Sequence, residues 1–290
     1  MLAGFFLILL ALAGLVASAC IAFFYGLPLA EVPALMQHPP RNASQRSMHL
    51  WFQAISAFGG FLLTSWLFIR WVERPAGPVL NPSGWPSALD FAVVSLLFIG
   101  VMPLSSVLIA WNADLDFPAF LAGFEQWARE KEQTLGEFTR FLIRFEGLGE
   151  LALGLLVIAF LPGLGEELLF RGVLQRNLGL WMGAGLAVWL AAAIFSAIHL
   201  QFFGFVPRVF LGVLLGYVYL WRGHLSLAVW GHTLNNGFTL LMAYCHQKGY
   251  VSYNILQIKA MPWPWVLASA LITAGCLFYL RSSARVLKRK

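Results

Sequence analysis

The chain has 290 residues, of which 60% are apolar and only 11% are charged, and its formal net charge at neutral pH is +6. Ordinary soluble domains carry about 25% charged residues, so this composition excludes a soluble globular protein and indicates a multi-span membrane protein. Five of the nineteen cations fall in the last ten residues: Arg281, Arg285, Lys288, Arg289 and Lys290. We therefore expect a basic cytoplasmic tail, with no nucleic-acid partner.

Three membrane spans are expected in the N-terminal part. Residues 1–24 are mostly apolar and carry no charge, and about 20 such residues cross a bilayer as a helix. A cleaved signal peptide, ending near Ala19 or lipidated at Cys20, is the alternative, but its usual basic start is missing. The second span is expected at about 51–69, after a loop that holds His38 and His49, and the third at about 91–111.

The segment 112–147 is polar, with seven acids and four bases between Asn112 and Glu146. Its apolar residues recur at steps of three and four, which predicts an amphipathic helix at the membrane surface or over the bundle. An interfacial linker is the simpler interpretation, and an element that recruits substrate is the alternative.

Five further apolar runs follow, at about 151–165, 181–205, 209–221, 225–244 and 263–280. The fold class is therefore predicted as all-α, a polytopic bundle of about eight transmembrane helices. An even number of spans places both termini on one side, and the basic tail places that side in the cytoplasm, which we expect to be that of a bacterium. The predicted domains are 1–147, the N-terminal spans with the amphipathic segment, and 148–290, a catalytic bundle.

Two adjacent carboxylates, Glu166 and Glu167, and Arg171 interrupt the apolar runs. A charge at the centre of a membrane costs about 2.5 to 3.5 kcal/mol, so three of them together imply partners, water access and a use. Glu167 and Arg171 are four apart on a helix and can pair, while Glu166 points about 100° away, toward a cavity. A structural ion pair with one extra carboxylate is the alternative. The remaining 123 residues hold no Asp or Glu, so acid–base chemistry in the C-terminal half is expected to use this pair.

Two further polar pairs follow on later apolar runs. Phe195 and His199 are one helical turn apart, and so are His232 and Asn236, which places two hydrogen-bonding groups on one helix face. A single histidine in a membrane helix can equally be a hydrogen-bonded packing residue. Four other histidines lie in loops or near helix ends and are assigned no chemistry: His38, His49, His224 and His246.

A carboxylate, two histidines and an amide can activate a water molecule and stabilise an oxyanion, which points to peptide hydrolysis within a membrane. The chain has no HExxH zinc motif and no GxSxG serine motif. Asp90, Asp114 and Asp116 lie at or beyond the ends of spans, so a facing aspartate pair is also excluded. The three cysteines have no CxxC spacing, so neither a disulfide framework nor a zinc knot is indicated.

The ordered trio Glu166-Glu167-x-x-x-Arg171, Phe195-x-x-x-His199 and His232-x-x-x-Asn236 resembles the three motifs of the CPBP family, which comprises the CAAX proteases and bacteriocin-processing enzymes and is also called the type II CAAX prenyl endopeptidase or Abi family. The resemblance covers about residues 148–244. It implies a bundle of about eight helices around a catalytic cavity. Eukaryotic members cleave near the C-terminus of lipidated proteins, and some bacterial members act in bacteriocin maturation or self-immunity.

By this resemblance, Glu166 is the general base that polarises water together with His199, and His232 and Asn236 donate hydrogen bonds to the oxyanion. Glu167, held by Arg171, orders the helix, and Phe195 supports the site. No cofactor is expected; two glutamates and two histidines could in principle hold Zn²⁺, but Asn236 is a poor zinc ligand. The expected partners are the lipid bilayer and a membrane-associated peptide or lipidated protein substrate. A non-proteolytic scaffold or immunity protein with this fold is the second hypothesis, and a transporter is a weaker third because the sequence shows no two-fold repeat.

Overall fold

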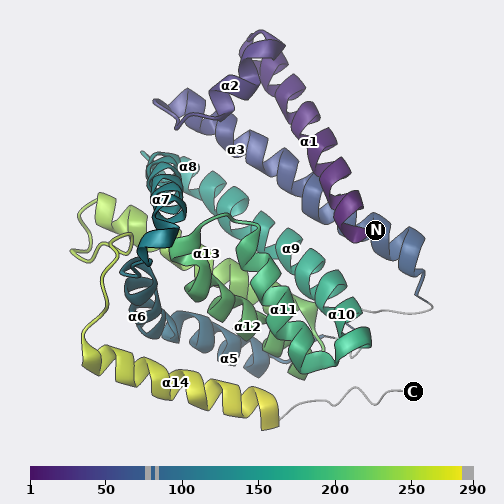
Figure 1. Ribbon diagram of the computed structural model, residues 1–290, viewed down its shortest axis with the longest axis vertical. Coiled ribbons are helices and arrows are strands. Elements are labelled where there is room, and N and C mark those ends of the chain that lie inside the picture. Colours follow the sequence, from purple (N-terminus) through teal and green to yellow (C-terminus); the bar gives the residue numbers. More distant parts are fainter. Residues whose placement is uncertain (76–79, 82–84, 283–290) are drawn as a thin grey trace. The chain divides into compact units, whose positions relative to one another are not determined.

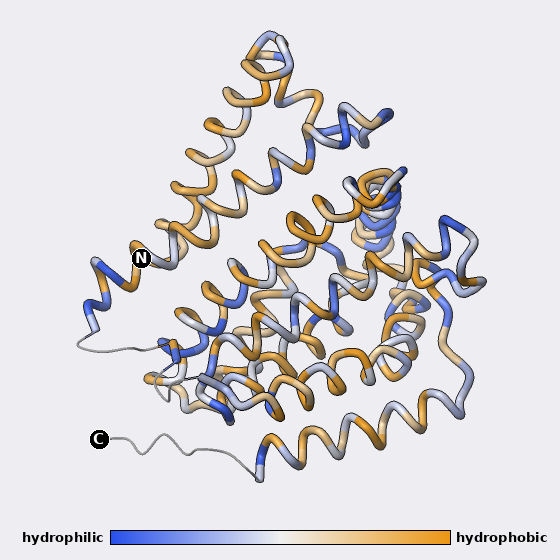
Figure 2. The backbone as a smooth tube through the Cα atoms, turned by 180° about the vertical axis from the view of Figure 1, so that it is seen from behind, coloured by the Kyte–Doolittle hydropathy of each residue, from blue (hydrophilic) through white to orange (hydrophobic). Residues whose placement is uncertain are grey.

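The computed structural model describes residues 1–75, 80–81 and 85–282. Every regular element in these ranges is a helix, which confirms the predicted all-α class. Six helices are long and apolar enough to cross a membrane: Leu2–Tyr25, Ala43–Glu73, Ala88–Ala113, Leu148–Met182, Phe202–Arg222 and Trp263–Ser282. Figure 2 shows the apolar residues distributed along these helices.

The two other predicted spans are also helices. One is α11 (Ala184–Ala197), which is apolar but shorter, and the other is α13 (Leu225–Gln247), which carries the polar pair His232 and Asn236. The second span begins earlier than predicted, at Ala43, so His49 lies on a helix and not in a loop. Of the predicted basic tail, only Arg281 is among the described residues, and the orientation of the chain stays a prediction.

The chain divides into two compact units, each built from three stretches. The first comprises Met1–Ala76, Thr134–Leu169 and Asn236–Ile255, and the second comprises Gly77–Gln133, Phe170–Asn235 and Leu256–Lys290. The boundaries cross α7 (Ala122–Leu142), α13 and the helix Leu148–Met182. The predicted division at 147/148 was based on family resemblance, whereas the two units are defined by contacts between residues. The predicted division therefore stays a prediction.

In the first unit, α1 (Leu2–Tyr25) and α3 (Ala43–Ala57) lie side by side (Figure 1). Helix α3 continues into the π-helical segment η2 (Phe58–Leu63), whose Gly59 and Gly60 allow α1 to approach closely. A Cβ atom at Gly59 would lie 2.4 Å from the Cβ atom of Ala13. Small residues serve this purpose at helix contacts in membranes. The unit also contains η1 (Leu29–Glu31), α2 (Val32–Met36), α4 (Thr64–Leu67) and η3 (Phe68–Glu73).

The first unit also holds the start of the long helix that carries the carboxylates, as α8 (Leu148–Gly154), η5 (Leu155–Phe160) and α9 (Leu161–Glu167). Pro162 has no N–H to bond the carbonyl four residues earlier, and the turns just before it are π-helical. Arg46 of α3 donates to both carboxylate oxygens of Glu150, at 2.9 and 2.8 Å. This pair ties α8 to α3.

In the second unit, α5 (Ala88–Gly100) and α6 (Met102–Ala113) pack along α14 (Trp263–Ser282), as Figure 1 shows. The Ser269 hydroxyl donates to the carbonyl of Gly100 at 2.6 Å and accepts from the N–H of Leu104 at 3.1 Å. A buried ion pair between Asp90 and Arg222 joins α5 to α12 (Phe205–Arg222). The second unit also contains η4 (Ala119–Leu121), α10 (Arg176–Met182) and η7 (Phe202–Gly204).

Two glycines one turn apart on α12 position the middle of the long helix, the π-helical segment η6 (Leu168–Gln175). The carbonyl of Gly212 accepts from Arg171 at 2.8 Å, and that of Gly216 accepts from Gln175 at 3.1 Å. A Cβ atom at Gly212 would lie 2.9 Å from the Cβ atom of Ala192 on α11. The Gly-x-x-x-Gly spacing therefore lets α12 approach both α11 and η6.

The predicted amphipathic segment contains α7, and Figure 2 shows its hydrophilic residues gathered there. Ala128 and Leu142 of its apolar side are buried, whereas Phe124, Trp127 and Phe141 are exposed. A helix is therefore confirmed in this segment, while its place at a membrane surface stays a prediction.

Candidate active site

Phe195 is the centre of a cluster in the second unit. Its ring, only 2% exposed, lies 5.1 Å from the ring of His199 and 6.0 Å from that of His232, both edge-on. The guanidinium of Arg171 lies 5.0 Å from the same ring, and the ring of Phe170 lies 5.2 Å away. Three predicted motifs, from η6, α11 and α13, therefore contribute to one cluster.

Arg171 is held firmly in this cluster. It is 1% exposed and donates to the Gly212 carbonyl of α12. An arginine inside a membrane bundle is stable only where its donors find acceptors, and its planar guanidinium also stacks on an aromatic face. The guanidinium of Arg171 thus holds the ring of Phe195 in place, and both histidines contact the same ring.

His199 lies in the turn after α11, outside the apolar helices on either side of it. Its Nδ1 atom is 2.8 Å from the carbonyl oxygen of Phe195. A carbonyl can only accept, so Nδ1 carries the proton and Nε2 carries the lone pair. Burial lowers the pKa of His199, and the positive charge of Arg208 lowers it further, to about 4. At neutral pH His199 is therefore an uncharged imidazole with an acceptor nitrogen.

A polar chain next to His199 was not predicted from the sequence. Arg208 of α12 donates to the side-chain oxygen of Gln201 at 2.8 Å, and the amide nitrogen of Gln201 donates to Glu132 of α7 at 3.2 Å. Burial raises the pKa of Glu132, an effect that Arg208 and Gln201 oppose. Glu132 of α7 thus joins the polar groups linked to Gln201, while the use of Glu166 and Glu167 for acid–base chemistry stays a prediction.

The two adjacent glutamates lie in the first unit and differ in environment. Glu167 is completely buried, whereas Glu166 is half-buried and lines a cavity of about 380 Å³. Helix geometry explains the difference, because successive side chains point about 100° apart. The walls of this cavity come from α1, α2, α3, η2, α7 and α9, all within the first unit.

Asn236 also belongs to the first unit, on the part of α13 that follows the boundary. Its Nδ2 atom donates to the carbonyl oxygen of Ile158 at 3.3 Å. Pro162, four residues after Ile158, has no N–H to give this carbonyl its ordinary α-helical partner. Asn236 therefore supplies a donor to this carbonyl, on the helix that carries Glu166.

The second unit thus brings together Arg171, Phe195, His199 and His232. The first unit holds Glu166, Glu167 and Asn236, so the convergence of all the predicted residues on one cavity stays a prediction. Within the described ranges, no three side chains of His, Cys, Asp or Glu are grouped as a metal ion would require.

The helices and this cluster define a multi-pass helical membrane protein with a polar site among its helices. Residues 148–238 match the family described as type II CAAX prenyl endopeptidase, Rce1-like, and this segment belongs to that family. The family resemblance predicted from the three motifs is thereby confirmed, since the match spans Glu166 to Asn236.

One curated relative is the uncharacterized protein YpbD of Bacillus subtilis (strain 168), to which this chain is 37% identical over 81 residues. The aligned part covers 27% of this chain and 36% of that protein, about a third of the relative's length. No solved structure matches the chain.

Proposed function

We propose that this chain is an intramembrane endopeptidase that cleaves peptide bonds in membrane-associated or lipidated protein substrates. The observation that carries the proposal is the cluster around Phe195. His199, in the turn after α11, and His232, on α13, both contact its ring, and His199 keeps an acceptor nitrogen. Proton acceptors in an apolar bundle are costly to keep unless they are used. The family match of residues 148–238 supports the same reaction class.

In the proposed reaction, Glu166 takes a proton from a water molecule that His199 orients. The water oxygen attacks the scissile carbonyl carbon, and His232 and Asn236 donate to the resulting oxyanion. The C–N bond then breaks as the proton on Glu166 passes to the leaving amine. The products are a carboxylic acid and an amine, and the carboxylate of Glu166 is regenerated without any cofactor.

The roles of the two glutamates differ in this proposal. Glu167, which is fully buried, is assigned to holding the helix in place together with Arg171, and Glu166, which lines a cavity, is assigned to the chemistry. The proposal requires Glu166 to meet His199. Paired cysteines from Glu166→Cys and His199→Cys test this requirement with a bifunctional thiol crosslinker that spans the two removed side chains and the water between them, because a direct disulfide would need Cα atoms within about 7 Å.

The experiment that tests the function compares the C-termini of membrane proteins in cells with the wild-type chain, without it, and with Glu166→Gln. A new C-terminus should appear only with the wild type. Glu166→Gln should lower turnover about 10²- to 10⁴-fold, as loss of a general base does, while the protein still folds. Glu146→Gln, at an exposed carboxylate, is the matched control. Full activity of Glu166→Gln would remove the base assignment.

A scaffold or immunity protein with the same fold gives a different result. In that case every variant keeps its biological effect and no cleavage product appears. We also propose that the basic tail lies in the cytoplasm, which a C-terminal reporter active only in that compartment tests directly.

A further inference from the structure

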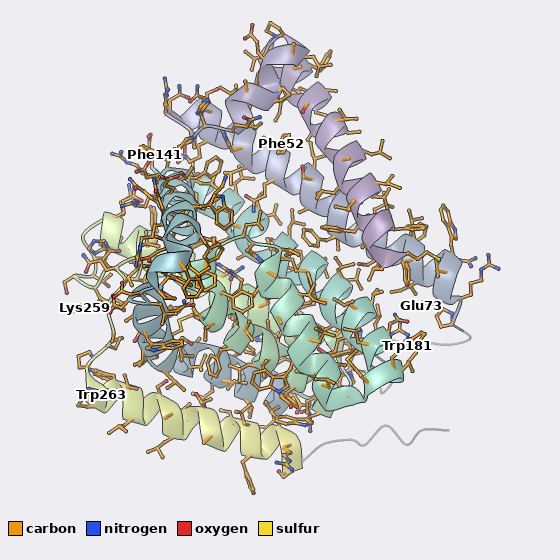
Figure 3. The ribbon with its side chains drawn as sticks, in the orientation of Figure 1. Phe52, Glu73, Phe141, Trp181, Lys259 and Trp263 are labelled. Carbon is orange, nitrogen blue, oxygen red and sulfur yellow. The ribbon has the colours of Figure 1, made fainter. Side chains whose placement is uncertain are left out.

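The cavity that Glu166 lines has a polar stripe on the wall formed by α3. His49, Gln53 and Ser56 all line it, at positions four and three residues apart, and therefore on one helix face. Phe52 of the same helix, marked in Figure 3, also lines the cavity. A volume of about 380 Å³ lies within the range of small-ligand sites, which are mostly apolar with a few placed polar groups.

Most of the cavity wall lies outside the Rce1-like segment. Of the residues that line it, only Pro162 and Glu166 fall within 148–238; the rest come from α1, α2, α3, η2 and α7. The family segment thus supplies the carboxylate, and the N-terminal part of this particular chain supplies what surrounds it. Residues that surround a reactive group decide which substrates fit.

The polar groups of the stripe are not equivalent. Both ring nitrogens of His49 face backbone carbonyl oxygens, of Gln45 at 2.7 Å and of His38 at 3.1 Å, and its ring packs edge-on against Phe138. His49 is therefore a fixed part of the wall. The Ser56 hydroxyl, in contrast, is buried without a hydrogen-bond partner among the described residues. A buried hydroxyl without a partner costs about 1 to 3 kcal/mol, so an occupant that pairs with it is favoured.

We propose that this cavity binds one apolar side chain of the peptide substrate together with its neighbouring backbone amide, and that α3 selects which sequences are cleaved. Ser56 and Gln53 donate to the substrate backbone, and the apolar wall that includes Phe52 and Phe138 surrounds the side chain. The inference rests on the proposed function, since it names the binding site of that reaction. A peptide fits better than a lipid chain, because an acyl chain offers no partner to Ser56.

The test uses the full-length protein in detergent and a library of peptides released from membrane proteins by a protease, with cleavage sites located by mass spectrometry. Ser56→Leu narrows the cavity. It should shift the preference at one substrate position toward smaller side chains by at least tenfold in relative kcat/KM, because a methylene in a pocket changes specificity about 10- to 200-fold. Peptides with small side chains should be cleaved within a few-fold of the wild-type rate.

Two companion variants make the result specific. Ser56→Ala removes only the hydroxyl and should lower kcat/KM about threefold to tenfold for all peptides, as loss of one hydrogen bond does. Ser44→Leu makes the same change as Ser56→Leu at an exposed position of α3 and should leave the profile unchanged. If Ser56→Leu and the wild type show the same cleavage-site preference, the inference is overturned. The proposed function is unaffected by that result.

A second test measures the reactivity of an introduced thiol and does not depend on the rate of cleavage. In a background with Cys20→Ala, Cys245→Ala and Cys276→Ala, the thiol introduced by Gln53→Cys, at a partly exposed position of the cavity wall, should react with a small water-soluble methanethiosulfonate. A peptide that the wild type cleaves should protect this thiol. No reaction at this thiol would overturn the inference alone. If the wild type cleaves no peptide in the library or in cells, the proposed function fails and the inference fails with it. A phospholipid that copurifies with the wild type and is lost in Ser56→Leu would overturn the peptide assignment.

Discussion

The ring of Phe195 can be removed while most of its volume is kept, by Phe195→Leu. Leucine still fills the space between η6, α11 and α13, so the change does not create the large cavity that alanine would. It does remove the edge-on contacts to His199 and His232 and the face that Arg171 stacks on. We expect the protein to fold with reduced stability and with both histidines displaced.

The magnitude follows from the interactions that the phenyl ring makes. Three ring pairs, with Phe170, His199 and His232, are worth about 0.5 to 1.5 kcal/mol each, and a desolvated cation–π contact about 2 kcal/mol. Terms within one cluster do not add fully, so the expected loss in free energy of unfolding is about 2 to 4 kcal/mol. Phe195→Ala should cost more, because it also leaves a cavity.

Two measurements test this prediction. Reversible unfolding in mixed detergent micelles gives the free energy, and NMR of labelled histidine rings reports whether His199 and His232 lose the ring current of Phe195. Phe202→Leu is the control, since its ring contacts are to Phe117, Phe124 and Phe203 and to no histidine. A loss below about 0.5 kcal/mol with unchanged signals of both histidines would refute the cluster as described.

Four other predictions have defined outcomes. Arg208→Gln removes a positive neighbour, so the pKa of His199 should rise above about 4. An NMR titration without that rise would show that Arg208 does not lower this pKa. Under the proposed pairing of Glu167 with Arg171, Glu167→Gln and Arg171→Ala should each lower the free energy of unfolding by about 3 to 5 kcal/mol, unlike Glu166→Gln; equal melting temperatures for all three would contradict the division of roles. Asp90→Asn removes the anion that pairs with Arg222 and should lower the free energy of unfolding by about 3 to 5 kcal/mol. Asp116→Asn, at an exposed carboxylate, should lower it by less than about 1 kcal/mol. The purified protein should contain no stoichiometric zinc and should keep its activity with chelators, which elemental analysis and assay will check.

The positions of the helices were predicted from the sequence more accurately than the residues at which the helices begin and end. The apolar run at 181–205 was expected to be one span, but the structure divides it. Gly183 has a φ of +83°, so α11 begins only at Ala184, and it ends at Ala197, shortly before Leu200 with a φ of +53°. A turn inside an apolar run leaves composition unchanged, so hydropathy alone does not locate it. Conversely, the run that begins near Leu151 continues past the charges of Glu166 and Arg171 to Met182, because buried acceptors such as the Gly212 carbonyl satisfy the arginine.

That His232 and Asn236 act together stays a prediction. Part of the Phe195 cluster could be predicted from spacing along the chain, because Phe195 and His199 are four residues apart and their rings are in contact. Arg208 and Glu132 could not, since their link through Gln201 joins α7 to α12 across a large sequence separation.

Asn236 illustrates how a proline within a neighbouring helix can orient a functional group. An amide has two N–H donors, and one of them is committed to the carbonyl of Ile158, which Pro162 leaves without its usual partner. That bond fixes the plane of the amide, so the second N–H keeps a constant direction and does not rotate toward competing acceptors. Donors that are oriented before the reaction stabilise a developing oxyanion without a reorganisation cost. Under the proposed mechanism, Pro162 therefore contributes to the oxyanion site through the orientation of Asn236, although its own ring donates nothing.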